Sequence, residues 1–275
     1  MCLESKAQTL IEQGRAAMQR SDYETAAGLL EKAVEQNPNS SEAHYLLGEA
    51  YGSLAQKANI FKQASLASKT HREFARAAEL DPNNLDARMG LIEFYILAPG
   101  FMGGDEKKAI EQANEIKKRD ALRGHQAFAR IYSQHKQHDL ARKEFVDAVR
   151  EQPNSPKSHY LLGISFLTAD KNYKSAAEEF EMAVKLDPAY MPAWFQIGHM
   201  AALSGANLAH GEEALQKYIA YTPKPDEPPA YRAHYWLGAI FEKLGKRAEA
   251  RQSYALSLRI NPRQPDVAEA LKKIS

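Results

Sequence analysis

The sequence predicts an all-α protein built from repeated helix pairs. Small and apolar residues recur at helical spacing along the whole chain, and the stretch 158–190 shows two such stripes, one after the other. A proline follows most of the second stripes, where it ends the helix. The 13 prolines and 15 glycines fall mostly at these regular intervals, which is typical of repeat punctuation rather than of a flexible linker.

The clearest repeat occupies residues 158–190. Its packed positions are His159, Leu162, Gly163 and Phe166 on a first helix, Ala176, Phe180 and Ala183 on a second, and then Pro188. Gly163 is small enough to let the second helix approach closely. This order resembles the tetratricopeptide repeat (TPR), in which an aromatic, leucine and glycine helix precedes alanine, phenylalanine and proline within about 34 residues. The resemblance implies a right-handed α-solenoid of about seven helix pairs with a C-terminal capping helix.

The same pattern of residues recurs along the whole chain. The expected repeats span about 7–40, 41–84, 85–121, 122–155, 156–190, 191–225 and 231–264, and a cap covers 265–275. We therefore expect a single solenoid over residues 1–275. The first repeat lacks its aromatic residue, but Asp22 before Tyr23 predicts a capped start of its second helix. The charged final segment is expected to shield the last repeat from water.

The second repeat carries an insertion. Gly48 and Phe74 stand 26 positions apart, against 16 for Ala129 and Phe145, so about ten residues are added. Neither glycine nor proline occurs between Gly52 and Pro82. We predict that the insertion lengthens the second helix of this repeat, which would overhang its neighbours by about 15 Å at 1.5 Å per residue.

Two further segments interrupt the pattern. Residues 98–105 hold three glycines and a proline, which predicts a structured loop with Asp105 capping the next helix. No lysine followed by serine or threonine completes a phosphate-binding loop there, so a structural turn is expected. Residues 222–229 hold four prolines and should be extended, with a possible offset of the neighbouring repeats.

These segments, with the long helix of the second repeat, resemble a group of bacterial TPR proteins of unassigned function. Members of that group commonly begin with a cleavable export leader. The resemblance favours an exported, periplasmic protein in trimmed form, and a cytoplasmic protein is the alternative. The single cysteine, Cys2, excludes an intramolecular disulfide and a cysteine metal cluster but does not separate the two compartments.

Composition excludes several classes of function. The net charge of +1 gives no general attraction to nucleic acid or to an anionic membrane. No apolar run approaches the ~20 residues of a membrane span. Neither HExxH nor GxSxG is present. We expect no enzymatic activity and no cofactor.

The histidines are expected to be structural. Four of them take the signature aromatic position of their repeats and should pack: His44, His125, His159 and His234. His135 and His138 form the only close pair, on a turn where two imidazoles are usually solvated. We expect no metal site there. A metal-dependent enzyme built around this pair is the alternative, and metal analysis of the purified protein tests it.

The resemblance also places a binding groove. In TPR folds the first helix of each repeat lines the concave face, and the fifth repeat positions here are Ile11, Tyr45, Met89, Gln126, Tyr160, Phe195 and Tyr235. Exposed apolar and aromatic residues at these positions suggest partner contacts. The expected partner-binding residues are Tyr45, Glu49, Met89, Glu93, Arg130, Tyr160, Phe195 and Tyr235. About half of the apolar ones could instead pad the next helix.

Charge at the second and ninth positions sorts along the chain. The acidic members are Glu42, Glu49, Asp86 and Glu93, and the basic members are Arg123, Arg130, Lys157 and Arg232. A groove acidic at one end and basic at the other would orient a partner, although eight charges could also sort by chance. We therefore expect a peptide or helix of another protein as the partner. The alternative is a self-assembling scaffold that uses the groove or the long helix of the second repeat.

Overall fold

The computed structural model describes residues 2–274 and the side chains of residues 6–168 and 171–274. Fifteen α-helices and one 3-10 helix form in these residues, and no strand occurs among them. The predicted all-α class is confirmed. None of the helices in this part of the chain is long and apolar enough to cross a bilayer. The chain divides after Glu144 into two compact units, which we call the first and second units.

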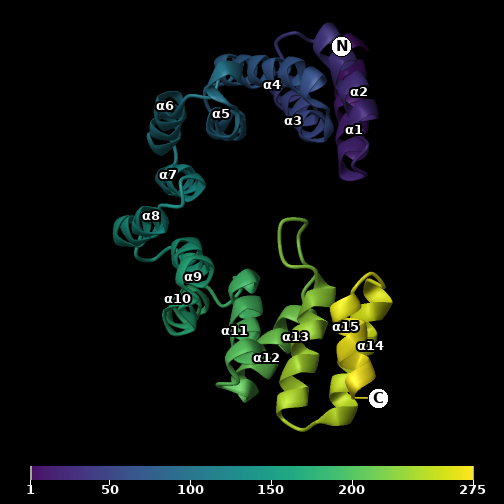
Figure 1. Cartoon of the computed structure of the whole chain (residues 1–275), viewed down its shortest axis with the longest axis vertical. Helices are drawn as coiled ribbons and strands as arrows, with labels where there is room; N and C mark the ends of the chain where they lie inside the picture. Colours follow the sequence, from purple (N-terminus) through teal and green to yellow (C-terminus); the bar gives the residue numbers. More distant parts are fainter. Residues whose placement is uncertain (1, 275) are drawn as a thin grey trace. The chain divides into compact units, whose positions relative to one another are not determined.

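The first unit consists of consecutive helix pairs (Figure 1). Helix α1 packs on α2, α3 on α4 and α5 on α6, and each pair contacts the next helix along the chain. Their bounds are α1 (Cys2–Gln19), α2 (Tyr23–Gln36), α3 (Ser41–Lys57), α4 (Ile60–Leu80), α5 (Leu85–Leu97), η1 (Gly100–Met102), α6 (Glu106–Lys117), α7 (Ala121–Gln134) and α8 (His138–Glu151). The unit boundary falls inside α8, within the predicted fourth repeat.

The second unit continues the same architecture. Its helices are α9 (Pro156–Asp170), α10 (Tyr173–Leu186), α11 (Met191–Ser204), α12 (Leu208–Ile219), α13 (Ala230–Lys243), α14 (Arg247–Ile260) and α15 (Pro265–Lys273). The pairs are α9 with α10, α11 with α12 and α13 with α14. Helix α15 packs on α14 and buries Val267 completely, so the predicted capping helix is confirmed.

Local side chains start the helices where the sequence predicts. The Asp22 side chain accepts a hydrogen bond from the Thr25 N–H at 3.3 Å and caps α2. Asp105 accepts from the N–H groups of Lys107 and Lys108 at 3.0 and 3.3 Å and caps α6. Both predicted caps are confirmed. Each one satisfies backbone donors that the first turn of a helix leaves without an intrahelical partner.

The signature glycines set how closely paired helices approach. A Cβ added at Gly163 would lie 2.6 Å from the Phe180 ring, closer than real contacts allow. The equivalent distance is 2.6 Å for Gly48 and Phe74. Phe74 also faces Gly90 of the next repeat, where an added Cβ would lie 2.7 Å away. In these two repeats the ring of the second helix therefore fills space left by a missing side chain, as predicted for Gly163, and Leu30 and Leu215 face Gly14 and Gly198 in the same way.

Replacing Gly163 with alanine should lower the free energy of unfolding by about 1–3 kcal/mol, because the added methyl group overpacks against the buried Phe180 ring. The matched control is Gly28→Ala in α2, where an added Cβ meets nothing within 4 Å. That change should raise stability by up to about 1 kcal/mol through helix propensity. Urea denaturation followed by circular dichroism measures both, and equal shifts in the same direction would contradict the interpretation.

The insertion in the second repeat lengthens both helices of its pair. Helix α3 has 17 residues and α4 has 21, against 14 in α2. The expected long second helix is present as α4, which begins after Asn59; the Asn59 side chain accepts a hydrogen bond from the Lys62 N–H at 3.2 Å and caps it. The start of α4 is strongly exposed, with Ile60 at 66% and Phe61 at 89%.

The loop after α5 is a compact turn, as predicted. Gly103 has a φ of +101°, which favours glycine, and a Cβ at Gly104 would lie 1.9 Å from the Ala98 carbonyl oxygen. The Asp105 N–H donates to the Tyr95 carbonyl at 3.0 Å and holds the loop against α5. Both glycines are therefore required by the backbone path of this loop.

The proline-rich segment 222–229 is not fully extended. The Glu227 N–H donates to the Lys224 carbonyl at 3.1 Å, and the Lys224 N–H donates to the Glu227 carboxylate at 2.9 Å, which closes a turn. The Tyr218 hydroxyl donates to the Pro228 carbonyl at 2.6 Å and ties the segment to α12. Both α11 and α12 pack on α13, so the segment does not interrupt the stacking of pairs within the second unit.

Candidate binding cavity

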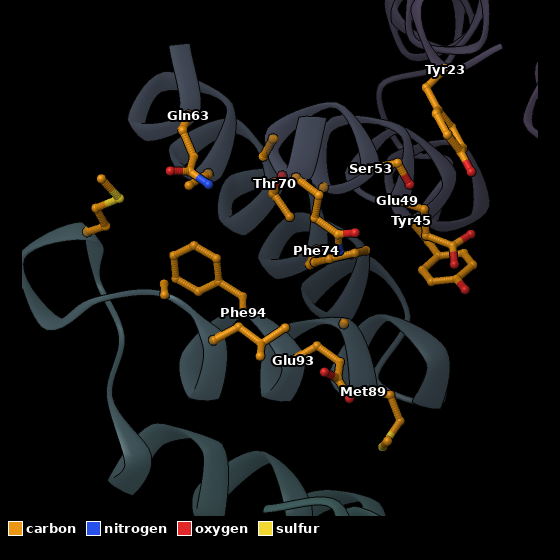
Figure 2. Close-up of a pocket in the computed structure, with 18 of the residues that line it drawn as sticks. Tyr23, Tyr45, Glu49, Ser53, Gln63, Thr70, Phe74, Met89, Glu93 and Phe94 are labelled. Atoms are coloured by element: carbon orange, nitrogen blue, oxygen red, sulfur yellow. The ribbon is translucent and has the colours of Figure 1, made fainter. Parts of the chain in front are cut away.

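A cavity of about 780 Å³ lies in the first unit between α3, α4, α5 and the loop that follows α5 (Figure 2). We call it the α3–α5 cavity. Its apolar wall includes the side chains of Tyr45, Phe74, Met89 and Phe94. Figure 2 shows the Phe94 ring directed from α5 toward α4. This volume exceeds that of a single side chain and falls in the range of ligand-binding sites.

The helical repeat brings four of the predicted binding residues to this cavity. Tyr45 and Glu49 lie one turn apart on α3, and Met89 and Glu93 lie one turn apart on α5, so each pair shares a face of its helix. Phe74 of α4 lies between these two helices, with its ring 6.0 Å from that of Tyr45. The close packing of Phe74 therefore holds the two lining faces at a constant separation.

Burial changes the acidity of two groups in the cavity. It raises the pKa of the Tyr45 hydroxyl, and the neighbouring Glu49 carboxylate raises it further. It also raises the pKa of Glu49, although the hydrogen bond from Tyr45 opposes that change. The negative charge of Asp86 adds to the effect on Glu49, and the positive charge of Arg15 reduces it. Glu49 thus carries its charge in a partly desolvated place.

Three ion pairs join first helices of neighbouring repeats. They are Arg15 with Glu42, Arg123 with Asp86 and Arg130 with Glu93. The Arg130 guanidinium binds both carboxylate oxygens of Glu93, at 2.7 and 2.8 Å, across 37 sequence positions. The expectation that acidic and basic residues stand apart at two ends of a groove is therefore wrong for these residues. The equivalent positions of stacked repeats are adjacent in space, so opposite charges there pair directly.

The second unit holds the other three predicted residues. Tyr160 is half-buried and packs on the Phe180 and Tyr190 rings at centroid distances of 5.8 and 5.5 Å. Tyr235 is half-buried and lies 4.6 Å from the Trp236 ring. None of these three residues lines the α3–α5 cavity.

The expected exposure of Phe195 is wrong. The residue is only 5% exposed and belongs to the core of the second unit. Its ring contacts Tyr218 at a centroid distance of 5.3 Å, because the aromatic side chain of the second helix reaches the same layer. The residue at the fifth repeat position therefore lines a cavity in one repeat and lies in the core in another. Ile11, at the equivalent position of the first repeat, is also buried.

Several lining residues were not predicted from the sequence. Phe94 follows Glu93 and enters the cavity from the adjacent position of α5, and Met102 arrives only through the turn after this helix. Met18 and Tyr23 belong to the preceding helix pair. The one local signal for these residues was the glycine-rich composition of the loop. It predicted a tight turn, but it did not predict that the turn would place Met102 in the cavity wall.

An aromatic cluster in the second unit was also missed. His199 stacks on Trp236 with a centroid distance of 4.3 Å and lies 6.1 Å from Phe195. Burial, with a contribution from the positive charge of Arg232, lowers the pKa of His199 to about 4. The ring is therefore neutral at physiological pH and packs as an aromatic group.

A second cavity, of about 810 Å³, lies between α10, α11 and α12 of the second unit. Charges of both signs line it, including Lys174, Glu181 and Lys185. His210 in its wall lies 2.9 Å from Glu181. It contains none of the predicted partner-binding residues.

Three of the signature histidines, His44, His125 and His159, pack in the interior, as predicted, and each also pairs with a glutamate, whereas His234 is half-buried. Nδ1 of His44 lies 2.6 Å from Glu73, and Nε2 lies 3.0 Å from the Pro38 carbonyl. The same two contacts, to Glu179 and Pro153, occur at His159. His125 lies 2.8 Å from Glu144. Each glutamate immediately precedes the aromatic residue of the second helix.

The seventh repeat departs from this arrangement. Ser253 stands where the other three repeats have glutamate, directly before Tyr254. Burial, aided by the charge of Arg259, lowers the pKa of His234. A histidine at the signature position therefore occurs here without the carboxylate that accompanies it elsewhere.

The close histidine pair lies on the turn between α7 and α8. His135 follows the last residue of α7 and lies 3.6 Å from Glu106, and His138 begins α8. Among the described side chains, those of residues 6–168 and 171–274, no group of three or more histidine, cysteine, aspartate or glutamate residues is arranged to hold a metal ion.

Curated relatives share part of the chain. Human antiviral innate immune response effector IFIT1 is 25% identical over 258 residues, which cover 83% of this chain and 50% of IFIT1. Human protein O-mannosyl-transferase TMTC1 is 26% identical over 154 residues, covering 52% of this chain and 17% of TMTC1. The chain thus spans half or less of the length of these relatives.

Solved structures share the fold. A human IFIT1 dimer with PPP-AAAA aligns over 98% of this chain and 63% of that one, with a TM-score of 0.54 and 20% identity. A tetratricopeptide repeat protein from Parabacteroides merdae aligns over 98% of this chain and 99% of its own, with a TM-score of 0.51 and 14% identity. The predicted likeness to TPR proteins of bacteria is therefore supported at the level of the fold.

The profile of the tetratricopeptide repeat family matches three ranges, 11–55, 127–190 and 200–265, which together make up more than half of the chain. Between the first two ranges lie α4 to α6, the region of the insertion and the glycine-rich loop. The matched glycines and second-helix side chains, such as Gly163 and Phe180, are those that interlock in the structure. This chain belongs to the tetratricopeptide repeat family, and its fold is a TPR solenoid of helix pairs closed by a C-terminal helix.

Proposed function

We propose that this protein is a non-enzymatic interaction module that holds a peptide or helix of a partner protein in the α3–α5 cavity. TPR folds generally serve as scaffolds for protein–protein interaction. One observation carries the proposal, namely that Tyr45, Glu49, Met89 and Glu93 line a single cavity with an apolar wall. Aromatic and methionine side chains in a concave site are typical of the anchoring points of protein interfaces.

The other predicted residues have different roles in this proposal. Arg130 keeps the Glu93 carboxylate in place and links α5 to α7, so it orients the cavity wall rather than contacting the partner. Tyr160 and Tyr235 are half-buried and are proposed as secondary contacts on the second unit. Phe195 belongs to the core cluster on which Tyr235 packs.

Two other functions fit the cavity less well. A solved structure of the human IFIT1 dimer is one with PPP-AAAA, but the charged residues that line the α3–α5 cavity here are Glu49, Asp86 and Glu93, which would repel a phosphate chain. TMTC1 is named a mannosyl-transferase, but this chain spans 17% of it, and we propose no catalysis here.

Affinity capture from a native extract tests the proposal. The immobilised wild type should retain a partner protein that the Tyr45→Ala, Met89→Ala double variant retains at least about tenfold less, because the variant removes two anchoring side chains. The matched control is Phe61→Ala, an apolar truncation at the exposed start of α4 outside the cavity lining. Mass spectrometry identifies the proteins, and circular dichroism checks that each variant folds. Identical proteins on all three columns would contradict the proposal.

Self-assembly is the second candidate, favoured by the exposed apolar residues Ile60, Phe61 and Phe101, of which Phe101 is 83% exposed. Such residues at the start of α4 and in the loop after α5 could meet another copy of the chain. Light scattering at two protein concentrations separates the two functions. A mass that rises with concentration and falls in Phe61→Ala would favour self-assembly, whereas a constant monomer mass favours the interaction module.

A further inference from the structure

The charge of the α3–α5 cavity has one sign. Its lining includes Glu49, Asp86 and Glu93, and no lysine, arginine or histidine lines it. The remaining wall is largely aromatic and apolar, with Tyr45, Phe74 and Phe94 supplying ring surfaces, whereas the Tyr23 ring already has the Lys57 ammonium group 4.5 Å from its centroid. A concave site with carboxylates and ring faces attracts cations and repels anions.

The three carboxylates differ in whether they already form an ion pair with an arginine of this chain. Asp86 is paired with Arg123, and Glu93 is paired with Arg130 through both oxygens. Glu49 forms no ion pair with a residue of 6–168 or 171–274, the residues whose side chains the structure describes, although its carboxylate is partly buried beside Tyr45. Arg15, whose positive charge acts on Glu49, forms its own ion pair with Glu42 at 2.5 Å.

A partly desolvated carboxylate that has no ion pair destabilises the folded protein. Binding of a cation next to the carboxylate offsets this destabilisation. The residue types in the cavity wall indicate which kind of cation fits there. Met18, Met89 and Met102 line the cavity together with the rings, so the site offers flexible apolar surface around the Glu49 carboxylate. A long aliphatic stem that ends in a positive charge fits such surface, because the stem is covered while the charged group reaches the carboxylate.

We propose that the α3–α5 cavity binds a lysine or arginine side chain of the partner segment, with the basic group at Glu49 and neighbouring apolar residues of the segment against the methionines and rings. This inference rests on the function proposed above. The cavity of about 780 Å³ has room for a basic side chain and its apolar neighbours together. The partner is thus a segment in which a basic residue stands among large apolar ones.

Three pools of fluorescent short peptides test the inference directly. Each pool is randomised except at one central residue, which is lysine, norleucine or glutamate. Norleucine has the stem of lysine without the ammonium group, so the comparison isolates the charge. The immobilised wild type should retain the lysine pool about tenfold more than the norleucine pool, and the glutamate pool least, with the preference for lysine reduced by added salt.

Two variants test whether the preference for the lysine pool depends on Glu49. Glu49→Gln should reduce the lysine preference to near unity while retaining the norleucine pool, whereas Glu35→Gln, on the exposed face of α2 and outside the cavity lining, should keep it. Because burial raises the pKa of Glu49, its ionised form destabilises the fold at neutral pH, so Glu49→Gln should be at least as stable as the wild type. A loss of preference in this variant is then an effect on binding and not on folding.

Each other outcome overturns the inference in a distinguishable way. Equal retention of the lysine and norleucine pools by the wild type would refute the basic ligand and leave the interaction module standing. A lysine preference that persists in Glu49→Gln would refute the assignment to this carboxylate. Retention of no pool by the wild type would contradict both this inference and the proposed function.

Discussion

Replacing Phe74 with alanine should lower the free energy of unfolding by about 3–5 kcal/mol, the usual cost of removing a buried aromatic ring. The residue is 6% exposed and fills the space left by Gly48 in its own repeat and by Gly90 in the next. Its removal therefore opens a void between α3 and α5 that neither glycine can fill. Urea denaturation followed by circular dichroism measures the change.

The same helix provides the control for Phe74. Phe61→Ala removes an identical ring that is 89% exposed, and its effect on stability should stay within about 0.5 kcal/mol. Phe74→Ala should also weaken partner capture, since Phe74 forms part of the cavity wall and Tyr45 packs on it. Similar losses of stability in the two variants would mean that the interlock of Phe74 with the glycines does not hold the pairs together.

Replacing Glu73 with alanine should lower the free energy of unfolding by about 1–3 kcal/mol at neutral pH, because it leaves the buried His44 ring without the carboxylate that is hydrogen-bonded to its Nδ1 atom. One oxygen of Glu73 lies 2.6 Å from Nδ1 of His44, and the other accepts from the Arg72 guanidinium at 2.9 and 2.8 Å. The exposed Glu35, changed in the same way, should alter stability by no more than about 0.5 kcal/mol.

The effect of Glu73 should depend on pH in a defined direction. Burial alone would raise its pKa, but the hydrogen bonds from His44 and Arg72 outweigh burial and leave the pKa below the ordinary value of 4.5. A carboxylate with a lowered pKa in the folded state stabilises above its ordinary pKa and loses that contribution as the pH falls through the folded value. The stability difference between the wild type and Glu73→Ala should thus be constant near neutral pH and shrink below about pH 4.5. A difference that grows on acidification would contradict this account.

Local features of the fold could be read from the sequence because their causes lie within a few residues. The spacing of Gly163 and Phe180 predicts two packed faces, and Asp22 and Asp105 predict helix starts through their own side-chain hydrogen bonds. The additional length of α3, the first helix of that repeat, was not predicted, and the reason is also local. Asn59 caps α4, but it is one of many polar residues in a run without glycine or proline, and its sequence context does not distinguish it.

The environment of a repeat position depends on its neighbours in space. Tyr45 and Phe195 occupy equivalent positions, yet Tyr45 lines a cavity and Phe195 is buried against Tyr218. The charges behave likewise, since Arg130 and Glu93 are 37 positions apart and pair across stacked helices. Sequence position predicted which face these residues share but not which partner they meet there.

The sequence by itself determined the helix pairs, their glycine interlocks, the capping helix and the family, because helical periodicity and turn chemistry are local properties that repeat along the chain. Only the tertiary structure decided which predicted residues line one cavity. It gathered Tyr45, Glu49, Met89 and Glu93 around that cavity and paired Glu93 with Arg130, while Glu49 forms no ion pair with the described side chains of residues 6–168 and 171–274. Exposure and ion pairing depend on distances between separate helices, and those distances are set by the packing of rings such as Phe74 against glycines of two repeats.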